Sequence, residues 1–275
     1  MDARGDQAGA VPLARAGDAA TFGGKAANLA RALGHGLPVP SGVALAWPLV
    51  DAVAAGDRRG VGEVKEACSS IGGRLAVRSS AVGEDSGGAS FAGRHASVLN
   101  VGAEVVDAVV AVWRSAHGEG ASAYRRRLGR GPNVRVAVVV QRLVDADVAG
   151  VAFTPHPVTG ADEVVVEAAW GLGEAVAGGL VVPDRFRLAP SGEVIERRPG
   201  NKHVDVRPAA GAGTATGQVA PERARALCLD DDGLARVHGL ATRCRQAFGG
   251  SQDLEWALAA GDLWLLQRRA VTTVS

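Results

Sequence analysis

The sequence predicts an α+β fold for a chain of 275 residues. Apolar residues make up 47% of the chain and charged residues 21%, which is typical of a globular protein with a substantial core. Segments with helical spacing and segments with strand character both occur. They do not follow one another in a regular strand–helix–strand alternation, and this favours α+β over a doubly wound parallel sheet.

Periodicity and turn residues indicate the order of the expected elements. An irregular loop rich in Gly and Ser is expected over residues 81–96, and a flexible stretch over 208–217. Helices are expected over 25–33, 48–70 (interrupted), 104–127 and 231–248. Short apolar runs predict strands at 43–46, 75–77, 134–140, 148–153, 164–168, 185–188 and 193–196, followed by two final strands.

Charge and cysteine content exclude several classes of protein. The formal net charge of +1 provides no basic footprint for nucleic acid, and Arg125, Arg126 and Arg127 fit a solvated helix face. Three scattered cysteines favour neither a disulfide framework nor a zinc site. The N-terminus lacks an apolar signal segment, and the apolar runs are too short to span a bilayer. These features predict a cytoplasmic protein that binds neither nucleic acid nor a membrane.

The C-terminal end of the sequence predicts a β-hairpin. A three-residue loop with a central Gly, 260–262, joins two strand-like runs. With the turn centred on that Gly, Asp253 lies opposite Arg269 and Glu255 lies opposite Gln267. Side chains alternate along a strand, so these four share one face. The other face, expected to be the core side, carries Leu254, Trp256, Leu258, Trp264 and Leu266.

The polar face of this hairpin supports two interpretations. The carboxylate and amide oxygens of Asp253, Glu255 and Gln267 are hard ligands suited to Mg²⁺, and an arginine beside them fits a phosphate group. Alternatively, Asp253 and Arg269 form a surface ion pair and the other two side chains are only solvated. Spacing alone leaves both interpretations open.

Gly-rich segments are further candidates for anion binding. Gly23-Gly24-Lys25 opens the first expected helix, so backbone N–H groups and a lysine would meet an anion together. The segment is not a Walker A motif, because the required Gly and Ser/Thr spacing is missing. The loop after Arg78 could close over phosphates or be an ordinary surface loop. Residues 170–174 fit a structural bend.

In their order along the chain, these and neighbouring segments form a recognisable series. They are GGKAANL (23–29), GLPVP (36–40), AVRSSA (76–81), ED (84–85), ASFAG (89–93), VVVQ (138–141), FT (153–154), PVTG (157–160), WGLGEAV (170–176), PDR (183–185), DLEW (253–256) and QRR (267–269). Together they resemble the nucleotide-binding domain of the phosphoenolpyruvate synthase and pyruvate phosphate dikinase family, which includes the rifamycin phosphotransferases. The resemblance covers nearly the whole chain.

The resemblance implies an ATP-grasp architecture. Residues 1–275 would form a single nucleotide-binding domain with lobes at about 1–140 and 141–275, and the nucleotide would lie between them. The implied cofactors are ATP and Mg²⁺.

The resemblance also implies roles for individual residues. Lys25 and Arg78 would contact phosphates, and Gly93 and Ser97 would lie in the loop that caps them. Gln141 and the backbone of Leu143 and Val144 would read the adenine. At the hairpin, Glu255 and Gln267 would hold Mg²⁺, with Arg269 at the transferring phosphate and Asp253 in support. The catalytic set would be Arg269, Lys25, Arg78 and Asp253.

The sequence departs from the family pattern in its phosphate loop, in a shorter stretch between Lys25 and Arg78, and in its domain content. The family's phosphate loop commonly continues with Gln, a polar residue, an acidic residue and Thr, whereas here it reads Arg94-His95-Ala96-Ser97. The acidic position is therefore lost, and Ser97 retains the hydroxyl. No swivelling histidine domain and no acceptor-binding domain are expected, because none of the six histidines has the Thr-Gly-Gly-x-x-Ser-His context. His156, in a Pro turn, is expected to be structural.

The resemblance implies a phosphotransferase function. In the family, the ATP-bound domain transfers a pyrophosphoryl group to the swivel histidine and releases AMP. The chain would then be a free-standing component that serves a histidine on a separate partner protein. The alternatives are a kinase acting directly on a small molecule, a non-catalytic ATP-binding module, suggested by the altered loop, and an excised domain of a longer protein. A carboxylate–amine ligase is disfavoured because the motifs match the dikinase branch.

Overall fold

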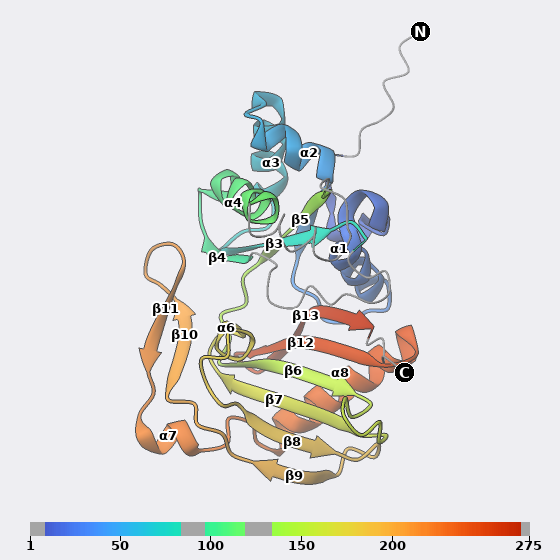
Figure 1. Ribbon diagram of the computed structural model, residues 1–275, viewed down its shortest axis with the longest axis vertical. Coiled ribbons are helices and arrows are strands. Elements are labelled where there is room, and N and C mark those ends of the chain that lie inside the picture. The colour runs from blue at the N-terminus through green and yellow to red at the C-terminus, as the bar shows by residue number, and fades with distance from the viewer. Residues whose placement is uncertain (1–8, 84–96, 119–133, 271–275) are drawn as a thin grey trace. The chain divides into compact units, whose positions relative to one another are not determined.

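The computed structural model describes residues 9–83, 97–118 and 134–270 (Figure 1). The chain divides into two compact units, Met1–Arg31 with Ser41–Leu143, and Ala32–Pro40 with Val144–Ser275. Each unit combines an antiparallel sheet with helices, which confirms the predicted α+β class. Among the helices that are described, none is long and apolar enough to cross a bilayer.

The first unit is built on a five-stranded sheet in which all neighbouring strands are antiparallel. The strand order is β1 (Ala10–Pro12), β2 (Gly42–Leu45), β5 (Val136–Arg142), β3 (Leu75–Ala81), β4 (Ser97–Val101). Its helical elements are η1 (Leu13–Arg15), α1 (Ala19–Gly34), α2 (Trp47–Ala54), α3 (Arg58–Ser69) and α4 (Val105–His117).

Helices α2, α3 and α4 cover one face of this sheet (Figure 1). Alternate strand residues, among them Val77, Val138 and Val140, are fully buried in the core beneath the helices. Trp113 of α4 donates its indole N–H to Asp51 of α2 over 2.7 Å, which ties these two helices together. The opposite face of the sheet is therefore the one that can carry polar side chains.

The second unit is built on a six-stranded antiparallel sheet, and α8 packs on it. A separate two-stranded hairpin, β10–β11, and the short helices α6 and α7 complete the unit. The sheet order is β13 (Asp262–Ala270), β12 (Gln252–Ala259), β6 (Val148–Thr154), β7 (Val164–Trp170), β8 (Asp184–Leu188), β9 (Val194–Arg198). The remaining elements are α6 (Glu174–Ala177), β10 (Val204–Pro208), β11 (Thr214–Gln218), α7 (Pro221–Arg225) and α8 (Asp231–Phe248).

A buried ion pair fixes the start of β8 in this unit. The carboxylate of Asp184 pairs with the ammonium group of Lys202, and both side chains have no exposed surface. Asp184 also accepts the backbone N–H groups of Gly200 and Cys228, each over 2.7 Å. The surrounding N–H groups thus stabilise the buried carboxylate, as a buried charge requires.

Most predicted elements occur close to their expected positions, with one clear exception. The helix over 231–248 is α8 with the same ends, and Asp230 caps it by accepting the N–H of Gly233. The stretch 208–217, expected to be flexible, instead turns at 209–213 and then forms β11. The flexible assignment was wrong because alternating Thr214 and Thr216 supply strand character within an Ala- and Gly-rich composition. The expected loop 81–96 falls largely outside the described residues.

The C-terminal hairpin has the predicted polar pairs, but its turn and its strand register differ from the prediction. Its turn has two residues, Ala260 and Gly261, both with positive φ, instead of the predicted three-residue loop. Such turns fit the twist of a hairpin. A β-bulge at Leu266 then shifts the pairing by one residue. As a result Leu265, not Trp264 or Leu266, lies opposite Trp256 and is fully buried, so the predicted core face of the second strand was wrong.

Candidate functional site

Three predicted nucleotide-binding side chains lie on one face of the first unit's sheet. Arg78 of β3 pairs directly with Ser97 of β4, and Gln141 of β5 pairs with Ala76, two residues before Arg78. Paired residues share a face, and so do residues two apart in a strand. Arg78, Ser97 and Gln141 therefore all lie on the face opposite the helix-covered core.

Lys25 is linked to the same strand through a break in α1. Gly23 has φ 76° and ψ 167°, so the helical residues after it form a new start. The hydroxyl of Ser80 donates to the carbonyl of Phe22 over 2.7 Å and accepts the N–H of Ala26 over 3.1 Å. Ser80 lies two residues after Arg78, and its hydrogen bonds hold the buried Lys25 near that strand.

Only Gly could occupy position 23 in this arrangement. A Cβ built there would lie 2.1 Å from the carbonyl oxygen of Ser80, far inside van der Waals contact. The positive φ also disfavours any residue with a side chain. The helix start after Gly23-Gly24 was predicted from the sequence, whereas the role of Ser80 was not. The two-residue spacing from Arg78 was the signal that could have found it.

The structure says less about the other residues predicted to contact the nucleotide, Gly93, Leu143 and Val144. Gly93 lies outside the described residues. The backbone N–H of Leu143 donates to the carbonyl of Arg74 over 2.8 Å. This N–H group is therefore already bonded within the first unit. An adenine bound at this segment would have to contact other backbone groups. Val144 is the first residue assigned to the second unit.

In the second unit, the hairpin brings the four predicted polar residues together. Asp253 pairs with Arg269 and Glu255 pairs with Gln267, as predicted. On the other side of β12, Asp253 lies opposite Phe153 and Glu255 opposite Val151 of β6. The four polar side chains thus form two adjacent cross-strand pairs on the face opposite Leu254 and Trp256.

The environment of these pairs suits a cation. Gln267 is 2% exposed, and its Oε1 atom is buried and accepts no hydrogen bond from the described residues. The pKa of Asp253 is raised by burial and by the nearby carboxylate of Glu255, while Arg269 acts in the opposite direction. A cation at Glu255 and Gln267 would give the buried amide oxygen a partner and offset the carboxylate repulsion.

The donor set limits which ion fits. The described residues contain no group of three or more His, Cys, Asp or Glu side chains arranged to hold a metal. One carboxylate and one amide oxygen form an incomplete shell of hard ligands. Mg²⁺ is commonly bound in this way, with water and substrate phosphates supplying the remaining ligands. The residues present therefore fit Mg²⁺ bound together with a nucleotide.

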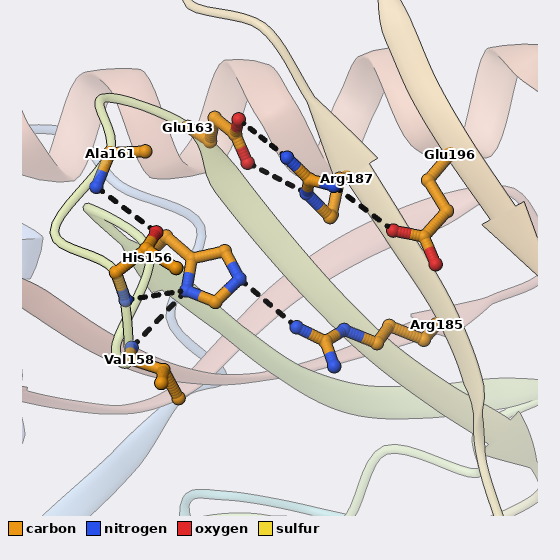
Figure 2. A network of polar contacts seen from close by, with 8 residues as sticks. His156, Val158, Ala161, Glu163, Arg185, Arg187 and Glu196 are labelled. Atoms are coloured by element: carbon orange, nitrogen blue, oxygen red, sulfur yellow. Dashed lines mark hydrogen bonds and ion pairs between the residues drawn. The ribbon is translucent and has the colours of Figure 1, made fainter.

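A second polar network lies beyond these pairs on β8 and on the loop after β6 (Figure 2). His156 accepts the backbone N–H groups of Val158 and Thr159 at Nδ1, each over 3.2 Å. Its Nε2 lies 3.0 Å from a guanidinium nitrogen of Arg185. The expectation that His156 is structural accounts for the two backbone bonds but not for the contact with Arg185.

Comparison with known proteins identifies relatives over most of the chain. The chain is 40% identical over 204 residues to a probable phosphoenolpyruvate synthase from Methanothermobacter thermautotrophicus, covering 73% of this chain and 30% of the relative. It is 39% identical over 203 residues to rifampicin phosphotransferase from Streptomyces sviceus, covering 72% and 23%. It is 36% identical over 283 residues to the prodigiosin synthesizing transferase PigC from Serratia marcescens, covering 92% and 32%. The chain thus spans less than a third of the length of these relatives.

Solved structures provide looser matches. PH1788 from Pyrococcus horikoshii shares 11% identity, covers 90% of this chain and 89% of its own, and superposes with a TM-score of 0.45. The model of the AMP/ATP-binding domain of pyruvate phosphate dikinase, in contrast, matches residues 58–275. That span includes Arg78, Gln141 and the whole C-terminal hairpin. The chain therefore belongs to the pyruvate phosphate dikinase AMP/ATP-binding domain family, as the sequence motifs predicted.

Proposed function

We propose that this chain binds Mg-ATP and transfers a pyrophosphoryl group to a histidine on a separate protein, releasing AMP. Membership of the AMP/ATP-binding domain family supports the proposal that the chain binds a nucleotide. The names of the relatives support phosphoryl transfer. The single observation that carries the proposal is the buried Oε1 of Gln267, which lies directly opposite Glu255 and has no hydrogen-bond partner among the described residues. A buried acceptor without a donor is costly in a native protein unless a ligand supplies the missing interaction.

The proposed roles follow from charge and position. Lys25 and Arg78 would hold phosphate oxygens, with the segment of Gly93 and Ser97 closing over them. Gln141, with the backbone of Leu143 and Val144, would read the adenine edge. These residues would position the nucleotide, and positioning is the main contribution a protein makes to phosphoryl transfer.

On the hairpin, Glu255 and Gln267 would hold Mg²⁺, and Arg269 would bind the group that is transferred. When bound, Mg²⁺ would neutralise charge on the phosphate oxygens. Arg269 would stabilise the negative charge that develops as the bond breaks. Asp253, paired with Arg269, would orient that guanidinium group and limit its movement.

The transfer step balances without a further reactant. A neutral histidine nitrogen of the partner attacks the β-phosphorus of ATP and forms an N–P bond. The bond between that phosphorus and the oxygen bridging to the α-phosphate breaks, and AMP leaves with this oxygen. The histidine proton passes to solvent. The product is a pyrophosphoryl-histidine on the partner protein.

Isotope labelling tests this proposal. A swivel-histidine domain, supplied as a separate polypeptide, is incubated with the chain, Mg²⁺ and ATP labelled at the β- or γ-phosphate. The proposal predicts AMP release and labelling of the histidine protein by both forms of ATP. ADP as the sole nucleotide product, with label only from the γ-position, would overturn the pyrophosphoryl step. Nucleotide binding without any turnover would show a non-catalytic module.

A further inference from the structure

The polar face of the second unit's sheet continues well past the proposed magnesium pair. Strand pairings place one residue from each strand in a row across the sheet. At about 4.8 Å per strand, Arg185 lies about 14 Å from Glu255 along this row. The row consists of Gln267, Glu255, Val151, Glu167, Arg185 and Arg198.

The hydrogen bonds of His156 fix which ring nitrogen carries the proton. Nδ1 accepts two backbone N–H groups, so its lone pair must be available and it cannot be protonated. A neutral imidazole has one proton, which must then be on Nε2. Nε2 lies 3.0 Å from Nη2 of Arg185, which is also only a donor. Two N–H groups therefore meet with no acceptor between them.

A neighbouring arginine shows what this contact lacks. Arg187, two residues further along β8, uses its Nε and Nη2 edge to bind both carboxylate oxygens of Glu163, each over 2.8 Å (Figure 2). The same edge of Arg185 has Nη2 against His156, and its Nε is buried with no hydrogen-bond partner among the described residues. One arginine edge is filled by an oxyanion and the other is not.

Among the described residues, no carboxylate fills this edge. Glu167 lies directly opposite Arg185 on β7, yet within the described part of the chain no hydrogen bond or ion pair joins the two. Glu163 is engaged by Arg187, and this interaction is the main cause of the lowered pKa of its carboxyl group. Arg185 is partly exposed, and residues 157–160 of the loop that holds His156 are exposed.

We propose that Arg185 and His156 form a binding site for an oxyanion, a carboxylate or phosphate group of a substrate or partner. The guanidinium edge would bind two oxygens, and the Nε2 proton of His156 would bind one of them. This ligand would accept the Nε–H of Arg185, which has no partner among the described residues, and the two N–H groups that face each other at 3.0 Å. The site is separate from the proposed nucleotide contacts, so either proposal can fail without the other.

Nuclear magnetic resonance on the full chain, without nucleotide, tests the site. The backbone amides of Val158 and Thr159 report binding in every variant, and ¹⁵N-labelled histidine reports the tautomer. Inorganic phosphate and acetate are titrated separately at constant ionic strength, which distinguishes the two oxyanion classes. We expect a protonated Nε2 and a saturable shift of both amides with at least one of the anions.

Substitutions distinguish specific anion binding at Arg185 and His156 from non-specific attraction of anions by positive charge. Arg185→Lys keeps the charge but loses the two-pronged edge, and His156→Asn keeps an acceptor for the loop amides but loses the Nε2 proton. Each should weaken anion binding about tenfold or more, as the loss of one charge-assisted bond predicts. The matched control Arg198→Lys, in the same row on exposed β9, should change it by less than about twofold.

Three results would overturn the proposal. They are a proton on Nδ1 of His156, no saturable shift with either anion, and equal weakening by Arg185→Lys and Arg198→Lys. Thermal unfolding of each variant verifies that it is folded. If the chain binds the anion but not ATP, only the nucleotide proposal is refuted. If it binds ATP but not the anion, only the oxyanion site is refuted.

Discussion

Two buried glutamines on the C-terminal hairpin should respond to the same substitution in opposite ways. Gln252 is fully buried, accepts the Nε–H of Arg268 over 2.6 Å and donates to the carbonyl of Gly249. Gln267 is almost equally buried, but its Oε1 has no donor among the described residues. Methionine matches the length of glutamine and removes the polar atoms, so it isolates the effect of these hydrogen bonds.

The expected changes follow from these contacts. Gln252→Met removes the acceptor of a buried guanidinium N–H and the donor to a carbonyl, and it should lower the free energy of unfolding by about 2–4 kcal/mol. Gln267→Met removes an unpaired acceptor and should leave that free energy unchanged or raise it by up to about 2 kcal/mol. Mg-ATP affinity should nevertheless fall about tenfold or more in Gln267→Met, since losing even an indirect metal contact commonly has that effect.

Urea denaturation and calorimetric titration of Mg-ATP measure the two quantities on the same samples. Gln252→Met, assayed where it remains folded, should bind Mg-ATP with nearly the affinity of the unmodified chain. A large loss of stability in Gln267→Met would show that the Gln267 amide has a structural partner, which contradicts the assignment of its Oε1 as an acceptor without a donor. Unchanged Mg-ATP affinity in Gln267→Met would refute the metal role.

Three further predictions concern stability. Ser80→Ala removes two hydrogen bonds that join β3 to α1 and should lower the free energy of unfolding by about 2–4 kcal/mol. The exposed Ser70→Ala should change this free energy by less than about 0.5 kcal/mol. Similar urea midpoints for the two variants would contradict this expectation. Asp253→Asn should stabilise the protein at neutral pH, because the raised pKa of Asp253 means that its charged form is disfavoured in the folded state. The gain in stability should disappear below the ordinary carboxyl pKa. Denaturation from pH 3 to 7 that shows no such trend would refute the pKa shift. Lys202→Met leaves the buried carboxylate of Asp184 without its cation and should destabilise by about 3–5 kcal/mol, and a loss below about 1 kcal/mol in urea would contradict the account of that pair.

The sequence predicted the elements well where periodicity and capping agreed. Helix α8 begins after an Asp N-cap and ends before Gly, and both signals are visible in the sequence. The hairpin was harder, because a two-residue turn and a bulge together give the same polar pairs as a three-residue loop. Only the core residues distinguish the two arrangements, and there the buried Leu265 replaced the predicted Trp264 and Leu266.

The candidate site could be predicted only in part, for a physical reason. Alternation within a strand was enough to group Asp253, Glu255, Gln267 and Arg269, because their pairing is local. The link from Ser80 to the break at Gly23 joins residues more than fifty positions apart, and no local pattern specifies it. The contact of His156 with Arg185 depends in the same way on the pairing of distant strands.

The proposed function requires that this chain bind ATP through Mg²⁺ at Glu255 and Gln267. Calorimetric titration of ATP into the unmodified chain and into Glu255→Gln, each with and without Mg²⁺, measures this binding. We expect saturable one-to-one binding that Mg²⁺ strengthens, and a loss of this Mg²⁺ effect in the variant. No binding of ATP, or the same Mg²⁺ effect in both proteins, would show that Mg-ATP is not bound in this way.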